Sequence, residues 1–248
     1  MPDVPAIAVP TAVILAAGNG DRFHNGIPQS KLLTAVAGTP LLVRTLRSAR
    51  QAGISTAHVV LGYDADRVRA LASAQAPDGL TLHFHLNRDW HRENGVSVLT
   101  TQRVLQRQPF ALLMGDHIFE AEALRRLLEA PRSAGETLLG VDRRPTDGAT
   151  AFEATKVRLD AGRVTHIGKT LDPFDALDTG LFVCCPTLFE ALVESCGDGD
   201  TTLSGGIGRL AARGLVRGVD IGQSRWCDID TIADLEAAEQ LVGRVFAS

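Results

Sequence analysis

The 248 residues carry 25 Lys and Arg against 29 Asp and Glu, a net charge of −4, and 45% of them are hydrophobic. This length and composition predict one soluble α/β domain spanning residues 1–248. The scattered charge excludes the basic patch that a nucleic acid or an anionic membrane would need. No run approaches the roughly 20 apolar residues of a membrane span, and no basic segment of a signal peptide precedes the first apolar run.

Strand and helix patterns alternate through the first half of the sequence. The strand-like runs are 12–16, 57–61, 80–86 and 110–114, and the helix-like segments are 40–52, 65–74, 95–106 and 120–129. This order predicts a mainly parallel sheet flanked by helices, with right-handed crossovers. In such sheets ligands bind beyond the carboxyl ends of the strands, so functional motifs are expected directly after strands.

After Gly135 the pattern changes to shorter strands. Strand-like runs occur at 137–141, 156–159, 164–167 and 180–184, and helical patterns return at 187–195, 203–212 and 231–246. Short strands separated by turn residues predict hairpins, and we expect a small antiparallel lid in this part of the chain. Four cysteines without a C-x-x-C pair predict reduced thiols and therefore a cytoplasmic protein.

A glycine-containing loop follows the first strand, in the segment VILAAGNGDRF at residues 13–23. Glycines allow backbone N–H groups to converge on an anion, most often a phosphate. The spacing matches neither a dinucleotide fingerprint nor a Walker loop, because Phe23 occupies a glycine position and no Gly-Lys-Ser/Thr occurs. A tight strand-to-helix turn is the structural alternative. Arg22 and Lys31 favour the phosphate interpretation, since two cations beside such a loop suit a triphosphate.

LAAGNGDRF, followed by PQSKL at residues 28–32, resembles the L-A-A-G-x-G-x-R … P-K signature of the nucleotidyltransferases that make activated sugars and alcohols. The family usually has Pro directly before the lysine, whereas here Gln and Ser intervene. Further segments resemble the inositol-1-phosphate cytidylyltransferases of that family: MGDHIFE (114–120), DRRP (142–145), EATKV (153–157), IGK (167–169), FDALDTGLFVC (174–184) and WCDIDT (226–231). The resemblance implies a Rossmann-like, GT-A-like fold and catalytic roles for Lys31 and Arg22. It places Leu15, Ala16, Ala17, Gly18 and Gly20 at the nucleotide.

Two carboxylates are the candidate ligands of a metal ion. Asp116 follows the apolar run 110–114 and is expected at the carboxyl end of a central strand, and Asp228 lies far downstream in WCDIDT. If the late segment folds back, the pair could hold Mg²⁺ against a triphosphate. A helix cap is the structural alternative for each. The resemblance implies that both bind Mg²⁺ and that Asp230 caps the last helix or orients a neighbour.

The resemblance also indicates where the base and the acceptor bind. It points to Gly95, Ser97 and Asn87 for the base and ribose, and to Lys169, Asp178 and Glu153 for the acceptor. An isolated lysine such as Lys156 is more often solvated. The histidines at 24, 83, 85, 91 and 117 are predicted in surface or packing roles, because no carboxylate or cysteine stands at ligand spacing.

These observations predict transfer of a cytidylyl group from CTP to myo-inositol 1-phosphate. Phosphocholine, 2-aminoethylphosphonate or a sugar 1-phosphate stay open as acceptors, UTP stays open as donor, and a catalytically silent nucleotide-binding module is the alternative from another class. In the cytidylyltransferase group this domain is often fused to a membrane phospholipid synthase. We expect a separate synthase to receive the product here, and a homodimer is left open.

Overall fold

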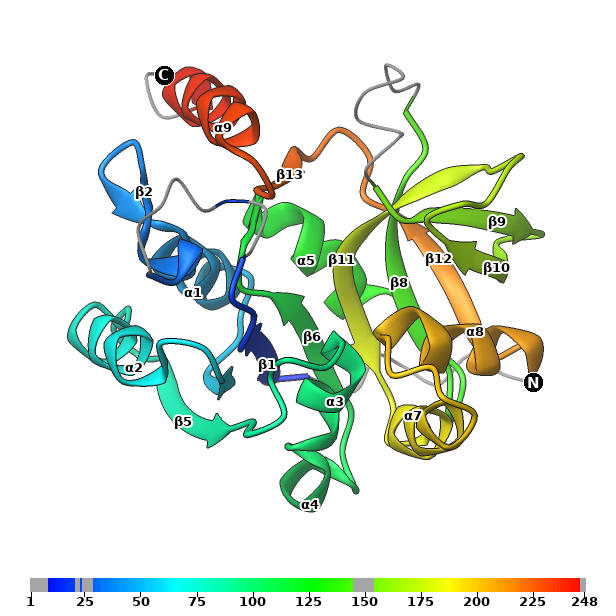
Figure 1. Ribbon diagram of the computed structural model, residues 1–248. Helices are drawn as coiled ribbons and strands as arrows, with labels where there is room; N and C mark the ends of the chain where they lie inside the picture. The colour runs from blue at the N-terminus through cyan, green and yellow to red at the C-terminus, as the bar shows by residue number, and fades with distance from the viewer. Residues whose placement is uncertain (1–8, 21–22, 24–28, 145–153, 246–248) are drawn as a thin grey trace.

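The computed structural model describes residues 9–20, 23, 29–144 and 154–245 (Figure 1). Its centre is a nine-stranded sheet of order β5-β4-β1-β6-β11-β8-β12-β10-β9. The strands are β1 (Thr11–Ala16), β4 (Thr56–Leu61), β5 (Thr81–Leu86), β6 (Phe110–Met114), β8 (Thr137–Asp142), β9 (Lys156–Asp160), β10 (Arg163–Gly168), β11 (Ala176–Cys184) and β12 (Val216–Asp220). The first four strands in this order pair in parallel, whereas β11 runs antiparallel to both β6 and β8. The predicted parallel sheet is therefore the first half of a larger mixed sheet.

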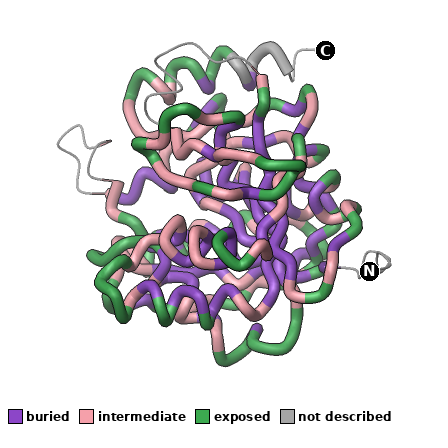
Figure 2. Tube along the Cα trace, turned by 90° about the vertical axis from the view of Figure 1, so that its right-hand side faces the viewer, coloured by how far each residue is buried: buried purple, intermediate pink, exposed green. Residues whose placement is uncertain are grey.

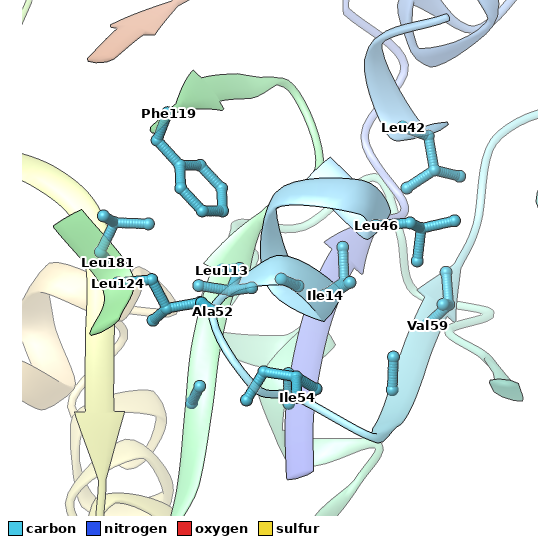
Figure 3. Close-up of a cluster of buried hydrophobic side chains, with 14 of the residues drawn as sticks. Ile14, Leu42, Leu46, Ala52, Ile54, Val59, Leu113, Phe119, Leu124 and Leu181 are labelled. Carbon is cyan, nitrogen blue, oxygen red and sulfur yellow. The ribbon is translucent and has the colours of Figure 1, made fainter. Parts of the chain in front are cut away.

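Helices cover both faces of this sheet. They are α1 (Leu41–Gln51), α2 (Ala65–Ala74), α3 (Asn94–Leu99), α4 (Gln102–Leu105), α5 (Ala121–Glu129), α7 (Thr187–Gly197), α8 (Leu203–Ala212) and α9 (Ile232–Val245). Alternate residues of β1 point to opposite faces. Ile14 packs with α1 and α5 in one apolar core, shown in Figure 3, and Val13 packs with α7 and α8 in the other. Figure 2 shows the buried strands enclosed by exposed helix surfaces.

Two small sheets and a 3₁₀ helix complete the described part of the chain. The 3₁₀ helix η2 (Lys31–Leu33) precedes the hairpin of β2 (Ala35–Val36) and β3 (Thr39–Pro40). Strand β7 (His117–Phe119) pairs antiparallel with β13 (Trp226–Asp228). Helix α9 follows β13 and packs its apolar side on β2 and the start of α1.

Three element predictions differ from the structure. The predicted helix at 95–106 is split into α3 and α4 where the Thr100 and Thr101 hydroxyls donate to carbonyls three residues earlier, which competes with the helical pattern. Strands β8 and β11, expected in the lid, lie in the middle of the main sheet because almost every residue in them is buried. Strands β9 and β10 form the expected antiparallel hairpin, but they belong to the same nine-stranded sheet. Strand β12 was not predicted.

The strand directions bring distant segments to one edge of the sheet. Strands β1 and β6 are parallel, and β8 runs in the same direction because both β6 and β8 are antiparallel to β11. The carboxyl ends of β1, β6 and β8 and the first residues of β11 therefore lie together. Four features belong to this edge: the loop that follows Ala16, and the residues Asp116, Asp142 and Asp178.

Candidate active site

Lys31 is the buried cation of the site. Its side chain is 9% exposed, and Nζ donates to the Ile229 carbonyl at 2.8 Å and to Asp230 Oδ1 at 2.9 Å. It also lies 2.8 Å from Asp116 Oδ2. Burial lowers the pKa of Lys31, but the charges of Asp116 and Asp230 outweigh burial and hold the pKa above its ordinary value. Lys31 is therefore a fixed positive charge.

The Lys31 side chain packs against the backbone at Gly20. Gly20 has a φ of +67°, which disfavours any residue with a Cβ, and a Cβ there would come 3.1 Å from Cγ and Cδ of Lys31. Leu15 and Ala16 form the buried end of β1, Ala17 follows it and is also buried, and nothing lies within 4 Å of a Cβ added at Gly18. The approach of this backbone to a nucleotide stays a prediction from the sequence. Arg22 lies outside the described residues.

Asp116, His117 and Asp228 form an acidic cluster with an imidazole at its centre. The β7–β13 pairing sets Asp228 opposite His117. His117 Nε2 lies 3.4 Å from Asp228 Oδ1 and 3.9 Å from Asp116 Oδ1. His117 Nδ1 lies 3.0 Å from the Thr179 carbonyl and must donate, because a carbonyl oxygen only accepts.

This cluster fits a divalent cation. Ligand atoms of Asp116, His117 and Asp228 all lie within 4.8 Å of one another. Asp228 Oδ1 is buried, and within the described residues it has the ion pair with His117 at 3.4 Å but no hydrogen bond of regular geometry, although a buried charged oxygen normally makes one. Carboxylate oxygens are the ligands that Mg²⁺ prefers. His117, predicted in a surface or packing role, is 12% exposed and packs beside the two candidate ligands.

Asp230 and Asp234 divide two tasks. Asp234 Oδ2 accepts from the Asp230 and Thr231 N–H groups, and the Thr231 hydroxyl accepts from the Asp234 N–H. This reciprocal capping box begins α9. Of the two roles suggested for Asp230, orienting a neighbour is the one observed, since its carboxylate holds Lys31.

Asp178 and Lys169 lie on the wall of the same pocket as the acidic cluster, a cavity of about 670 Å³. Burial raises the pKa of Asp178 to about 6, and its Oδ1 accepts from the Gly180 N–H at 2.8 Å. Lys169 follows β10, and its carbonyl accepts from Lys156 Nζ at 2.6 Å. Gly180, with φ of +72°, leaves room for the His117 ring, which a Cβ would approach to 2.5 Å. Glu153 lies outside the described residues.

The residues predicted near the base make contacts within the protein. Asn87 Nδ2 donates to Ser97 Oγ at 3.0 Å, both side chains are buried, and Asn87 Oδ1 accepts from the Asp89 N–H. Gly95 permits close packing of α3 on the segment before α8, since a Cβ would lie 2.6 Å from the Thr201 carbonyl. Asn87, Gly95 and Ser97 do not line the pocket, and binding of the base by them stays a prediction.

Lysine usage is a signal that the motif analysis missed. Lys and Arg together number 25, yet lysine occurs only at 31, 156 and 169. Lys31 contacts the acidic cluster, Lys169 lines the pocket, and Lys156 donates to the Lys169 carbonyl. Lys differs from Arg in its compact ammonium group. The preference for arginine elsewhere in the chain sets these three positions apart.

A parallel half-sheet with a glycine loop, joined to a pocket of carboxylates and lysines, defines a nucleotidyltransferase-like site. Residues 12–170 match the model of the MobA-like NTP transferase domain, and the chain belongs to this family. Among curated proteins it is 40% identical over 235 residues to "Bifunctional IPC transferase and DIPP synthase" of Rubrobacter xylanophilus, covering 93% of this chain and 51% of that protein. It is 33% identical to "CMP-5'-(3-aminopropyl)phosphonate synthase" of Streptomyces rubellomurinus, covering 94% of this chain and 39% of that protein.

Solved structures share the fold. The inositol-1-phosphate CTP transferase from T. maritima superimposes with a TM-score of 0.84 at 23% identity, over 97% of each chain. A UDP-glucose pyrophosphorylase complexed with UDP-glucose gives 0.76 at 15% identity, over 95% of this chain and 99% of that one. The chain spans about half the length of the first curated relatives it matches. Within the described residues, every helix is too short or too polar to cross a membrane.

Proposed function

We propose that residues 1–248 form one nucleotidyltransferase domain that transfers the cytidylyl group of CTP to myo-inositol 1-phosphate. The observation that carries the proposal is one pocket lined both by Asp116 and Asp228 and by Lys169 and Asp178. The first pair suits a metal-bound triphosphate, and the second suits a phosphate with hydroxyl groups. The 40% identity to the "Bifunctional IPC transferase and DIPP synthase" supports this acceptor.

In the proposed reaction, an oxygen of the acceptor phosphate attacks the α-phosphorus of CTP. The new P–O bond forms as the bond to the β-phosphate oxygen breaks, and pyrophosphate leaves with the electron pair. Lys31, held by Asp116 and Asp230, and Arg22 offset the charge that grows on the phosphates. The buried position of Lys31 keeps this charge in place before the reaction begins, so little reorganisation is needed.

We assign Asp116 and Asp228 as the residues that hold Mg²⁺, with His117 beside them. A bound Mg²⁺ supplies neutralisation of the phosphate charge. The buried Asp228 Oδ1, which makes no regular hydrogen bond within the described residues, supports the assignment. A cytoplasmic location, a homodimer and transfer of the product to a separate membrane synthase stay predictions from the sequence.

An amino-phosphonate acceptor is the second candidate. Six carboxylates line the pocket, at Asp116, Asp142, Asp178, Asp228, Asp230 and Asp234, and a cationic head group would suit this charge. The Streptomyces relative supports the same candidate by its name. A polyol remains the better fit, because Asp116, Asp142 and Asp230 already have cationic partners in the protein.

Pyrophosphate release tests both candidates. CTP and UTP should each be paired with myo-inositol 1-phosphate, phosphocholine, glucose 1-phosphate, 2-aminoethylphosphonate and 3-aminopropylphosphonate in the presence of Mg²⁺. We expect the highest kcat/KM for CTP with inositol phosphate, and loss of turnover in Asp116→Ala and Asp228→Ala. A higher kcat/KM with a phosphonate would make the phosphonate, and not inositol phosphate, the acceptor. No pyrophosphate release with any pair of substrates would favour a silent binding module.

A further inference from the structure

The strand that carries Asp228 is too short to fix that residue by itself. Strand β13 has three residues and pairs only with β7, which also has three. A two-stranded sheet of this size is marginal without further contacts. A carboxylate that holds a metal must nevertheless stay within about 0.5 Å of its working position. Other groups must therefore fix β13.

Asp142 and Arg144 provide those contacts. The Trp226 indole Nε1 donates to Asp142 Oδ2 at 2.9 Å. Arg144 donates through Nε to Asp142 Oδ1 at 2.9 Å and through NH2 to Asp142 Oδ2 at 2.6 Å. The same Arg144 NH2 donates to the Ser224 carbonyl at 3.0 Å. The Asp142–Arg144 pair thus holds the chain at Ser224 and Trp226, four and two residues before Asp228.

The anchor itself belongs to the main sheet. Asp142 is the last residue of β8 and is 5% exposed. It lies opposite Leu177, the neighbour of Asp178 on β11. A buried carboxylate held by a bidentate arginine and an indole N–H has little freedom to move. The position of Asp228 is therefore fixed, through Trp226 and Asp142, relative to strands β8 and β11, and β11 also carries the acceptor-side residue Asp178.

We infer that Asp142 is a positioning residue that sets Asp228 for metal binding through Trp226. The inference rests on the proposed function, because it requires Asp228 to be a metal ligand. Groups that orient metal ligands typically change metal affinity 10–100-fold when they are removed. Removing only the Trp226 N–H, or only the charge of Asp142, should accordingly weaken metal binding while the fold persists.

The variants Trp226→Phe and Asp142→Asn test the inference, with Mn²⁺ as the probe and its binding measured by electron paramagnetic resonance in the presence of CTP. Trp226→Phe keeps the apolar ring and removes the donor, and Asp142→Asn keeps the shape and removes the charge. We expect each to raise the Kd for Mn²⁺ by about ten-fold or more. Their combination should add little, because both break the same connection.

Glu136→Gln is the matched control. Glu136 directly precedes β8, is 3% exposed and lies within 3.5 Å of Arg163 and Arg217, so it is also a buried carboxylate held by arginine, but outside the pocket. It should lower the unfolding midpoint yet leave the Kd for Mn²⁺ unchanged.

Asp228→Ala separates failure of the inference from failure of the proposed function. If Asp228→Ala weakens Mn²⁺ binding but Trp226→Phe and Asp142→Asn bind like the wild type, Asp142 is not a positioning residue and the metal site stands. Unchanged Mn²⁺ binding in Asp228→Ala, or none in the wild type, overturns the metal site and the inference together. An equal loss in Glu136→Gln would show a general effect of stability and would also overturn the inference.

Discussion

At the scale of single residues, the site depends on how opposite charges are distributed. Lys31 touches Asp116 and Asp230, and His117 Nε2 lies 3.4 Å from Asp228 Oδ1. Burial lowers the pKa of His117, but the neighbouring Asp228 and Asp116 outweigh burial and raise the pKa to about 9. Two internal cations therefore face three carboxylates, which leaves one negative charge of the cluster for a bound cation.

Lys31→Ala tests the first of these cations. Removing Nζ leaves Asp116 and Asp230 without their shared partner and removes the fixed charge beside the phosphates. We expect kcat to fall about 10²–10³-fold, the range seen when a single group that stabilises a transition state is lost, with a smaller change in the KM for CTP. Steady-state kinetics measures both. A rise in KM at constant kcat would instead make Lys31 a ground-state binding residue.

Gly20→Ala tests whether the loop conformation sets Lys31. Alanine at a φ of +67° is strained, and its Cβ would press on the Lys31 methylene groups. We expect kcat to fall in the same direction as in Lys31→Ala, with the double variant no worse than Lys31→Ala alone. Independent multiplication of the two effects would show that Gly20 acts separately from Lys31.

At the scale of elements, packing of helices around the pocket depends on small residues. Helix α3 meets the segment before α8 at Gly95, whose N–H donates to the Thr201 carbonyl at 3.0 Å. Asn94 Oδ1 accepts from the Leu203 N–H at 2.8 Å and so caps α8 from α3. The two helix starts are locked together beside the pocket.

Gly95→Ala should therefore destabilise the protein. The added Cβ would lie 2.6 Å from a backbone oxygen, and backbone can yield only by moving α3 from α8. We expect a loss of about 1–3 kcal/mol in the free energy of unfolding, as in other overpacked sites, measured by urea denaturation. Gly197→Ala at the end of α7 is the control, because nothing lies within 4 Å of its added Cβ. Equal stability of the two variants would contradict the packing role of Gly95.

The edge strand β5 and its neighbour β4 carry a histidine cluster that makes stability depend on pH. His58 Nδ1 lies 2.8 Å from His85 Nε2, and the His58 ring stacks on His83. Burial, with the neighbouring His85 and His83, lowers the pKa of His58 to about 4. The unfolded chain then binds more protons than the folded one between about pH 6.5 and 4, so stability falls as the pH is lowered through this window.

His58→Gln should reduce this pH dependence. We expect the difference in urea midpoint between about pH 7 and about pH 5 to shrink in His58→Gln, since glutamine does not titrate. His166→Gln, at an exposed position on β10, should leave the difference as in the wild type. An unchanged difference in His58→Gln would place the pH dependence elsewhere.

At the scale of the whole molecule, the sequence predicted the parallel half better than the antiparallel half. Apolar runs followed by helical patterns are local signals, and they located β1, β4, β5 and β6. The position of β11 between β6 and β8 depends on pairing between distant segments, which no local pattern contains. The contact of His117 with Asp228 and the hydrogen bond from Trp226 to Asp142 were missed for the same reason, because each joins a distant segment to β13.

In the proposed reaction, the parallel half of the sheet binds CTP and the antiparallel half binds the acceptor. A variant in the antiparallel half tests this division. Lys169 follows β10 and lines the pocket, whereas the glycine loop follows β1. If Lys169 binds the acceptor phosphate, Lys169→Ala should raise the KM for inositol phosphate about ten-fold and change the KM for CTP far less. A charge that contacts only one substrate contributes only to the binding of that substrate.

Arg158→Ala is the control for Lys169→Ala, because Arg158 is a cation of the same hairpin whose guanidinium donates to the Pro173 carbonyl, outside the pocket. Its KM values should match those of the wild type. Equal increases in both KM values for Lys169→Ala would mean that the hairpin closes over CTP and acceptor together. An increase in the KM for CTP alone would mean that Lys169 contacts the nucleotide. The acceptor would then bind away from β10.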